Sequence, residues 1–419
     1  MSGFSFRCKR VAAFVDQHYC VGGAQLMPFY QTLEDYQWLV SADAEPWLRQ
    51  VSAHGGSLVQ LTAALRGKLT ASQTHLVLEQ VELRRRGIVK FSQAERMYFT
   101  CQGLEQASGE RIAEYKARRF HHNVPAADLC CGIGGDLLAI ARRCPVVAVD
   151  RCPIATLVAT TNCRVIGVQT AGILERTVSV DLLANVAQWH LDPDRRVAGR
   201  RATRVDQYDP DRETIQWLLA ENRNAAVKLA PAANVPAQWQ EAELEWISDS
   251  RECKQLVAWF GKLANQNGLR AATRVDRDGV ATTLTGRPDV AIPTADRIGD
   301  FVYEPDPAVL ASGLVGEMAR SAGLESVAPH CGYLTGAACA PHPLRSAFRV
   351  MELLPFDVKR LKALLRARNV GALTIKKRAV DIDPAWLARK LATSGGQAAT
   401  LLIMPHAGKT LAVLAQRAV

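Results

Sequence analysis

The chain has 419 residues, of which 48% are apolar and 22% charged; these proportions are ordinary for a soluble protein, and the length predicts two to four domains. No stretch approaches ~18 uninterrupted apolar residues, which excludes a transmembrane helix, and residues 1–17 lack the apolar core of a signal peptide. The 11 cysteines form no Cys-x-x-Cys pair, so we expect a reduced, cytoplasmic protein without a structural zinc or other metal site.

The positive charge is concentrated in the C-terminal part of the chain. The formal net charge is +10, and residues 341–419 contain 14 Lys plus Arg against 4 Asp plus Glu, a difference of +10. The preceding 340 residues are therefore neutral overall. Such a surplus indicates an anionic partner, most simply a nucleic-acid backbone. A solvated basic surface without a partner is the alternative, and charge alone does not separate the two.

The first predicted elements are helices. Residues 1–26 show no firm pattern, whereas residues 28–120 have a helical pattern, with one helix at 72–86 that ends at Gly87. The run Ser-Gln-Ala-Glu at 92–95 predicts a capping box for the next helix. We expect these helices to cover one face of a sheet, although they could also lie over a bound ligand.

The most informative motif is DLCCGIGGD at residues 128–136. It follows a short apolar strand at 126–127 and precedes a helix, with Asp136 as a plausible N-cap. Three glycines in four positions let a ligand approach the main chain without obstruction by a Cβ atom. The next strand ends at Asp150, where an acid can bond the two hydroxyls of a ribose. This spacing predicts nucleoside binding.

Helices and strands continue to alternate as far as residue 284. Helices are predicted at residues 153–164, 212–221 and 252–260, and strands at residues 177–180, 187–191, 225–229 and 243–248. A hairpin is predicted at 273–284, with its turn at 276–279. This order predicts an α/β, doubly wound sheet with one antiparallel edge strand. Asp181 follows the strand at 177–180, where an acid could meet an adenine amine.

The last two segments differ in character. Residues 287–345 contain several prolines and one predicted helix at 308–321, which indicates a small connecting domain. Residues 346–419 have the order β-α-β-α-β-β of a compact two-layer domain, with elements at 348–354, 357–368, 373–378, 383–391, 400–404 and 410–414. The predicted division is therefore a helical region at 1–124, a nucleoside-binding domain at 125–286, a connecting domain at 287–345 and a basic domain at 346–419.

Taken together, these motifs resemble the bacterial class I S-adenosylmethionine (SAM) methyltransferases that carry a C-terminal THUMP-like domain. The resemblance runs from about residue 104 to the C-terminus and rests on the segments at 104–108, 128–136, 190–196, 227–231, 245–248 and 375–378. The glycine loop is also similar to that of trimethylguanosine synthases, which methylate an exocyclic guanine amine. The resemblance implies a Rossmann-like methyltransferase sheet, SAM as the cofactor and RNA, as tRNA or rRNA, as the substrate.

The resemblance also implies roles for individual residues. Asp128 would steady the loop around the methionine part of SAM, Asp150 would bind its ribose and Asp181 its adenine. The other cofactor-binding residues would be Cys130, Gly132, Gly134 and Gly135. For the basic domain, phosphate contacts would come from Lys359, Lys362, Lys376, Lys377 and Arg378.

A second motif would act on the methyl acceptor. Amine-directed methyltransferases resemble one another in a motif Asp/Asn/Ser-Pro-Pro-aromatic after the fourth strand, where the acid and the next carbonyl bond the amine. This chain has Asp192 and Pro193 in the catalytic places, followed by Asp194 and Arg195 instead of proline and an aromatic residue. Arg195 could stack through its guanidinium plane or bind a phosphate.

Several alternatives stay open at the level of sequence. Asp192-Pro193 could be a strand-ending turn, Asp150 a helix N-cap, and Lys228 could face the site or lie at the sheet edge. Two other functions also fit: a small-molecule or protein N-methyltransferase, and a non-catalytic RNA-binding protein with a vestigial SAM pocket. The sequence does not indicate an oligomeric state.

Overall fold

The computed structural model describes residues 31–418, with gaps at 55–56, 198–199 and 202, so the expectations for residues 1–26 lie outside it. Four helices form an N-terminal lobe: α1 (Leu33–Leu39), α2 (Glu45–Ala53), α3 (Leu58–Arg66) and α4 (Ala71–Gly87). The helix predicted at 72–86 is confirmed as α4. It begins with a capping box between Thr70 and Gln73, and its buried side chains include Leu76, Val81 and Leu83.

The capping box predicted at 92–95 is wrong. Residues 92–96 form turns, and the Ser92 amide donates to the Glu110 carboxylate (2.7 Å). The Ser92 amide is therefore paired with a side chain 18 residues away, and not with a capping residue of a local helix. The next helices are α5 (Cys101–Gln106) and α6 (Glu110–Ala117), which lead into the first strand.

The central element is a nine-stranded sheet of strand order β11-β10-β8-β9-β7-β4-β1-β2-β3. Its strands are β1 (Ala126–Leu129), β2 (Val146–Asp150), β3 (Gly172–Glu175), β4 (Gln188–Leu191), β7 (Ala225–Leu229), β8 (Glu243–Asp249), β9 (Glu252–Trp259), β10 (Arg270–Val275) and β11 (Ala281–Gly286). β1 pairs in parallel with both β2 and β4. The strand order reverses there, and the crevice beyond the carboxyl ends of such strands is the usual ligand site of an α/β sheet. The predicted doubly wound fold is confirmed.

The remaining elements of this domain agree with the predicted ones except at two places. α7 (Leu137–Ala141), α8 (Pro153–Ile166) and α9 (Arg212–Glu221) lie where expected, and a short ribbon pairs β5 (Arg196–Val197) with β6 (Arg200–Arg201). The strand predicted at 177–180 is wrong, because the chain pairs with β2 five residues earlier, as β3, and then forms the 3-10 turn Val180–Leu183.

The helix predicted at 252–260 is also wrong, because this segment is β9. It lies antiparallel between β7 and β8, which pair with its two edges. Residues 255–259 are all buried, so both faces of the strand are covered there and its apolar residues run consecutively instead of alternating. Its hairpin turn places Ser250 (φ 52°) and Arg251 (φ 64°) in the left-handed region. Turns of this kind usually contain Gly or Asn, so the sequence carries no hairpin signal here.

The C-terminal lobe, residues 301–418, is built on a seven-stranded sheet of order β13-β14-β12-β15-β18-β17-β16. Its strands are β12 (Phe301–Pro305), β13 (Glu325–Ser326), β14 (Leu334–Gly336), β15 (Arg345–Pro355), β16 (Val370–Lys377), β17 (Gln397–His406) and β18 (Lys409–Arg417), and its helices are α10 (Pro307–Ser312), α11 (Val315–Ala322), α12 (Val358–Ala367) and α13 (Pro384–Leu391). The β-α-β-α-β-β order from β15 onward agrees with the prediction. Because β12 pairs with β15, the sheet continues across the boundary predicted at residue 345. The helix predicted at 308–321 is split by Gly313 (φ 74°).

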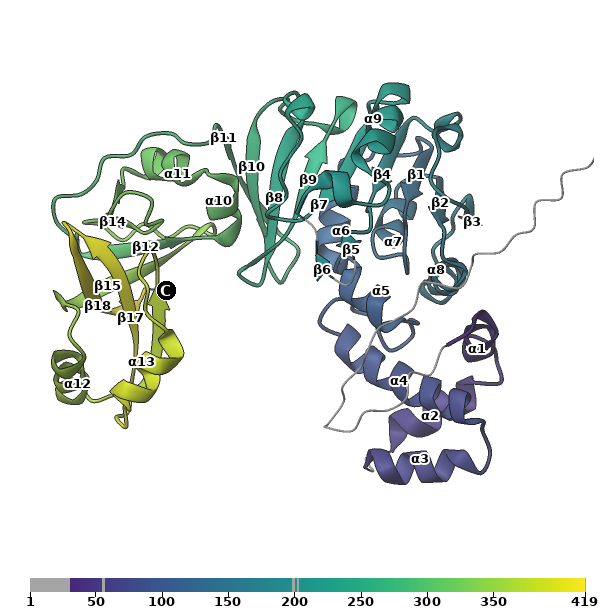
Figure 1. Cartoon of the computed structure of the whole chain (residues 1–419), viewed down its shortest axis with the longest axis horizontal. Coiled ribbons are helices and arrows are strands. Elements are labelled where there is room, and N and C mark those ends of the chain that lie inside the picture. The colour runs from purple at the N-terminus through teal and green to yellow at the C-terminus, as the bar shows by residue number, and fades with distance from the viewer. Residues whose placement is uncertain (1–30, 55–56, 198–199, 202, 419) are drawn as a thin grey trace, which may run out of the picture.

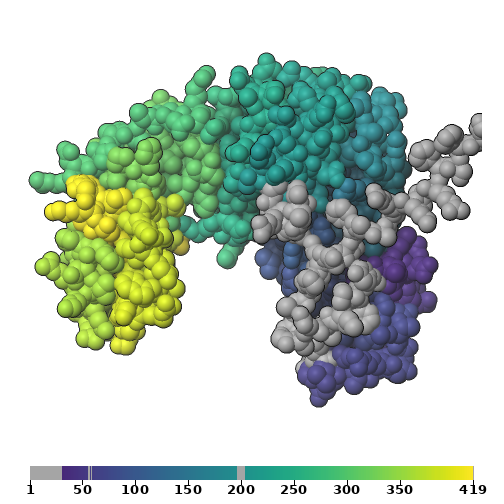
Figure 2. Space-filling view, viewed as in Figure 1, coloured from purple at the N-terminus to yellow at the C-terminus, as the bar shows by residue number. Residues whose placement is uncertain are grey.

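The two lobes project from the same side of the nine-stranded sheet (Figures 1 and 2). The segment after α6 is fixed against the sheet by Arg119, which donates to Glu243 (2.8 Å) and Glu245 (2.9 Å) and lies 4.3 Å from the centre of the Trp259 ring. The β8–β9 turn reaches the other lobe, since Arg251 pairs with Glu304 of β12 (2.6 Å). Charged side chains thus fix the segment before β1 to the sheet and tie the C-terminal lobe to the same sheet.

Candidate functional site

The glycine loop after β1 has the backbone geometry that the motif predicts. Cys130 (φ 59°), Gly132 (φ 55°) and Gly134 (φ 92°) all take left-handed conformations. The Gly132 amide donates to one carboxylate oxygen of Asp150 (2.9 Å), and the Cys152 amide donates to the other (2.9 Å). Asp150 therefore both ends β2 and holds the loop.

The loop has one open side and one filled side. A Cβ atom at Gly132 would meet no atom within 4 Å, so the main chain there is accessible to a ligand. At Gly135, a Cβ atom would lie 3.1 Å from the Ala107 Cβ and 3.1 Å from the Ser108 carbonyl oxygen. A Cβ atom at Gly103 would collide with Ile133. The segment 103–108, whose Leu-Glu-Gln-Ala-Ser motif the sequence singled out, packs directly against the loop.

A buried charge network of Lys116, Asp136, His190 and Asp128 lies behind the loop. The Lys116 ammonium pairs with Asp136 (2.6 Å), and these side chains are only 2% and 7% exposed. Asp136 occupies the predicted N-cap position, but its side chain caps no amide; it accepts from the Ser108 hydroxyl (2.7 Å) instead. The His190 ring shares a hydrogen bond with Asp128 through Nδ1 (2.7 Å). The predicted N-cap bond of Asp136 is therefore wrong, because the ion pair takes its place.

Burial and charge act in opposite directions in this network. Burial alone would raise the pKa of Asp136, but Lys116, His190 and Lys228 hold that pKa well below its ordinary value. Burial lowers the pKa of Lys116, and Asp136 opposes that effect. Burial raises the pKa of Asp128, whereas its bond to His190 lowers it. Opposite charges in contact thus offset part of the cost of burying Lys116 and Asp136 away from water.

Sequence reasoning missed Lys116 and His190. The sequence did contain one signal for Lys116. Ile112, Ala113 and Ala117 recur at helical spacing, Lys116 lies among them, and all four are buried on the same helix, α6. A lysine in the apolar stripe of an amphipathic helix indicates a buried cation that needs a partner. His190 likewise lies within the apolar strand β4.

Asp192 lies at the end of β4, beside the glycine loop. Its amide donates to the Leu129 carbonyl (3.1 Å), which continues the pairing of β4 with β1. One of its carboxylate oxygens, Oδ2, accepts from the Lys228 ammonium (2.6 Å), which also donates to the Gln106 carbonyl (3.3 Å). Of the two positions left open for Lys228, the structure shows the one facing Asp192, on the internal strand β7.

The residues after Asp192 are held by contacts on both sides. Pro193 is buried, and the Asp194 backbone forms two hydrogen bonds with Asp209 (both 2.9 Å). The Gln106 side chain donates to the Asp194 carboxylate (3.3 Å). Arg195 is half-buried. The segment 103–108 therefore contacts both the glycine loop, through its packing there, and the residue after the Asp-Pro pair, through Gln106.

Asp181 is more remote from these groups. It lies in the exposed 3-10 turn after β3, where it accepts from the Ser179 hydroxyl (2.5 Å) and pairs with Arg176 (2.9 Å). These two groups lower its pKa. Its carboxylate is ionised and reachable from solvent, and contact with an adenine amine stays a prediction.

The predicted nucleic-acid residues fall into two places in the C-terminal lobe. Lys359 and Lys362 lie on α12, exposed and half-buried respectively. The β16 end is different, because Lys376 (2.7 Å) and Arg378 (3.7 Å) both reach the Glu304 carboxylate, which Arg251 also contacts. Lys377 donates to the Val380 carbonyl (3.2 Å). Three cations thus share one carboxylate where β12 meets the β8–β9 turn, and no sequence signal linked Glu304 to them.

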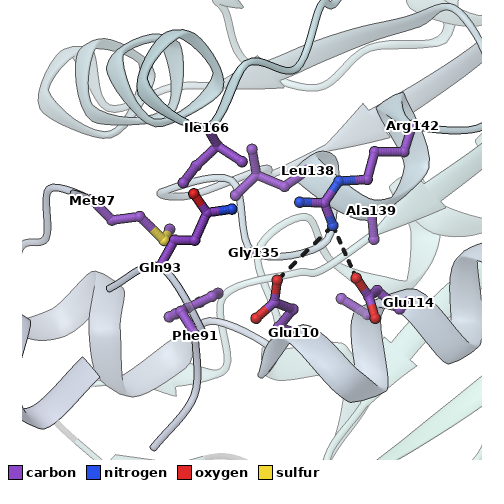
Figure 3. Close-up of a pocket in the computed structure, with 11 residues that line it drawn as sticks. Phe91, Gln93, Met97, Glu110, Glu114, Gly135, Leu138, Ala139, Arg142 and Ile166 are labelled. Carbon is purple, nitrogen blue, oxygen red and sulfur yellow. Dashed lines mark hydrogen bonds and ion pairs between the residues drawn. The ribbon is translucent and has the colours of Figure 1, made fainter. Parts of the chain in front are cut away.

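In the part of the chain that the structure describes, no other pocket, metal site or membrane-spanning helix provides a second candidate site for the reaction. A pocket between the residue 91–97 segment, α6, α7 and Ile166 is bordered by Arg142, whose guanidinium pairs with Glu114 at 2.9 Å (Figure 3). Its volume of about 20 Å³ has room for roughly one water molecule. Among the described residues, no group of three or more His, Cys, Asp or Glu side chains is placed to hold a metal ion. Over the same residues, no helix is long and apolar enough to cross a membrane.

Comparison with known proteins adds three findings. Residues 346–417 match the sequence family described as "THUMP domain-like". Two proteins of Mycobacterium tuberculosis, from strains CDC 1551 and H37Rv, are each 30% identical to this chain over 340 residues, which is 78% of this chain and 91% of theirs. Both are named uncharacterized S-adenosylmethionine-dependent methyltransferases. The crystal structure of a proposed methyltransferase from Porphyromonas gingivalis W83 superposes with a TM-score of 0.74 at 21% identity, covering 92% of this chain and 98% of that one.

Proposed function

This chain belongs to the family of S-adenosylmethionine-dependent methyltransferases, and from that premise we propose that it methylates a base nitrogen of tRNA or rRNA. The observation that carries the proposal is the meeting of the glycine loop, Asp150 and Asp192 at one edge of the sheet, where the strand order reverses between β1 and β4. The THUMP domain-like match and the charge surplus of the same segment favour an RNA substrate over a small molecule or a protein.

The residues at this edge fit SAM. The cofactor supplies a methyl group bound to a sulfonium, which makes that carbon electrophilic. Asp150 would bind the ribose hydroxyls, and the open main chain at Gly132 would lie against the cofactor, with Gly134 next to it in the same loop. One Asp128 oxygen, Oδ2, is buried and has no hydrogen-bond partner among the described residues, so this acid retains acceptor capacity beside the loop. Cys130 and Asp181 are proposed as further cofactor contacts. Gly135 would contribute only through its main chain, because Ala107 and Ser108 fill the side on which a Cβ atom would project.

Replacing Asp150 by alanine should weaken binding of S-adenosylhomocysteine at least about 100-fold, because two hydrogen bonds to a carboxylate are lost at roughly 1.5–3 kcal/mol each. The variant also loses the acceptor of the Gly132 amide, so the loop itself is less well held. Isothermal titration calorimetry measures the affinity. Asp206→Ala removes another acid, one that pairs with Arg204 and Arg212, and should bind as the wild type does. Equal affinities for wild type and Asp150→Ala would refute the ribose assignment.

The acceptor chemistry is assigned to Asp192 and Pro193. Methyl transfer is an in-line displacement, so the protein mainly has to hold the acceptor nitrogen and the methyl carbon in line. Lys228 occupies Oδ2 of Asp192, while Oδ1 has no partner among the described residues and is left for the acceptor amine. The Pro193 carbonyl would accept the second hydrogen of that amine. The nitrogen loses a proton after transfer, and the Asp192 carboxylate would be the base that receives it.

RNA docking is assigned to the basic surface of the C-terminal lobe. Charge reversal of two α12 lysines, Lys359→Glu with Lys362→Glu, should weaken RNA binding about tenfold and reduce the salt dependence by roughly one to two released ions. Binding of S-adenosylhomocysteine should not change, because these side chains lie in the other lobe. Filter binding at several salt concentrations gives both quantities. Arg66→Glu with Lys68→Glu in the N-terminal lobe changes the net charge equally; the same loss in that control would mean that net charge alone matters.

The proposed reaction is tested in cells. RNA from a strain lacking the gene and from its parent should differ in one methylated nucleoside when digests are compared by mass spectrometry. Re-expression of the wild-type chain should restore this nucleoside, and the Asp192→Ala variant should not. Identical nucleoside profiles in tRNA and rRNA would overturn the proposal.

A further inference from the structure

A second hollow lies at the opposite edge of the nine-stranded sheet, which we call the amino-edge groove. It has a volume of about 440 Å³ and is lined by Tyr115, Arg118, Arg119, Phe120, His121, His122, Arg143, Lys262, Leu263 and Asn265. His121 and His122 precede β1, Arg143 precedes β2, and Lys262 follows the antiparallel strand β9. All of these segments lie at the ends of the sheet that face away from the glycine loop. Strands of four or five residues separate the two edges by roughly 15 Å.

The lining of the amino-edge groove is strongly basic. Six of its ten residues are Arg, Lys or His, and none is Asp or Glu. Arg119 is neutralised by Glu243 and Glu245. The remaining five are the ones available to a ligand: Arg118, His121, His122, Arg143 and Lys262.

The charges of Arg118, Arg143 and Lys262 are not compensated within the groove, and His121 and His122 add ring nitrogens beside them. Arg143 donates to the carbonyls of Phe120 (3.2 Å) and Arg118 (3.3 Å), and Arg118 donates to the Gly279 carbonyl (3.3 Å). A carbonyl accepts the hydrogen bond but leaves the positive charge uncancelled. Among the described residues, no hydrogen-bond or ion-pair partner is found for the exposed Lys262 ammonium or the exposed His122 ring. The turn that contains Gly279 also carries Asp276 and Asp278, neither of which lines the groove.

We propose that the amino-edge groove binds phosphate groups. Arginine guanidinium groups present paired donors that match phosphate oxygens, and Lys262 adds a flexible point charge at the rim. Ligand pockets span about 300–1,000 Å³, so the groove has room for a ligand of nucleotide size. The phosphate belongs either to a segment of the RNA remote from the methylated base or to a free polyphosphate. The site is separate from the cofactor edge and stands whether or not the proposed RNA methylation is correct.

Inorganic pyrophosphate is the probe for the test, titrated calorimetrically into the full chain at pH 7. The variant Lys262→Ala with His122→Ala removes two exposed side chains and should bind pyrophosphate at least tenfold more weakly than the wild type. The matched control is Arg223→Ala, at the same edge but paired with Glu241 (2.7 Å) and outside the groove lining. It should bind as the wild type does. Binding of S-adenosylhomocysteine by each variant shows that the protein is folded.

A second arm identifies the source of the phosphate. If the double variant also binds RNA more weakly and with a lower salt dependence, the ligand is the RNA backbone. If RNA affinity is unchanged while pyrophosphate binding is lost, the ligand is a free polyphosphate. No binding of pyrophosphate by the wild type together with unchanged RNA affinity of the variant would overturn the proposal. An equal loss in the Arg223→Ala control would do the same.

Discussion

Replacing Asp192 by alanine should lower the rate of methyl transfer to RNA by about 10²–10⁴-fold, the usual contribution of a positioned acid or base. The acceptor amine would lose the carboxylate that orients its lone pair and receives its proton. The Gly132–Asp150 contact does not involve Asp192, so the affinity for S-adenosylhomocysteine should stay within about twofold of the wild type. Single-turnover transfer of a labelled methyl group measures the rate, and calorimetry measures the affinity.

A loss of rate in this variant could also arise from Lys228, whose ammonium is 5% exposed and would lose its partner. Asp192→Asn is the better-matched change, because it keeps the shape and one acceptor oxygen but removes the charge. Adding Lys228→Met to Asp192→Asn removes the unpaired ammonium as well. If the double variant regained the wild-type rate, Asp192 would serve only to neutralise Lys228, and its catalytic assignment would be refuted.

Replacing Lys116 by methionine should lower the free energy of unfolding of the nine-stranded domain by about 3–5 kcal/mol, the typical cost of removing one partner of a buried ion pair. Asp136 would be left buried without its closest cation, so its carboxylate would either stay charged at a high cost or take up a proton. For a domain of this size the loss corresponds to a drop in melting temperature of roughly 10 °C. Urea unfolding followed by tryptophan fluorescence gives the free energy, since Trp189 and Trp259 lie within this domain.

Two further variants separate the buried charge from simple packing. Lys116→Met with Asp136→Asn removes both charges and should recover more than half of the lost stability. Arg85→Met breaks an exposed pair with Glu82 (3.9 Å) and should change stability by no more than about 0.5 kcal/mol. A Lys116→Met variant as stable as Arg85→Met would show that the buried pair does not hold the loop in place.

The sequence predicted best those elements whose signals are local. The glycine loop and α8 follow from residues adjacent in the chain, and Pro153 and Gly167 mark the limits of α8. The helices and strands from β15 to β18 could be predicted equally well, because Asp357 and Asp383 mark the starts of the two helices as N-caps. The positions of these elements in the two sheets follow from the usual rules of α/β topology.

The sequence failed where pairing between distant residues decides the structure. The β9 segment has four consecutive apolar residues from Leu256 to Trp259, a run that fits a helix or a strand covered on both faces equally well. Only its neighbours β7 and β8 resolve that ambiguity. The same holds for the site, since the partners of Asp136 and Asp128 lie 20 and 62 residues away, at Lys116 and His190.

The most direct test of the proposed activity is transfer of a labelled methyl group from SAM to RNA isolated from a strain that lacks this protein. The full chain should transfer label to a base nitrogen of one tRNA or rRNA species, and RNA from the parent strain should accept little, because its site is already methylated. If the chain binds S-adenosylhomocysteine but leaves every RNA species unlabelled, RNA is not its substrate and the role assigned to the basic C-terminal lobe is wrong.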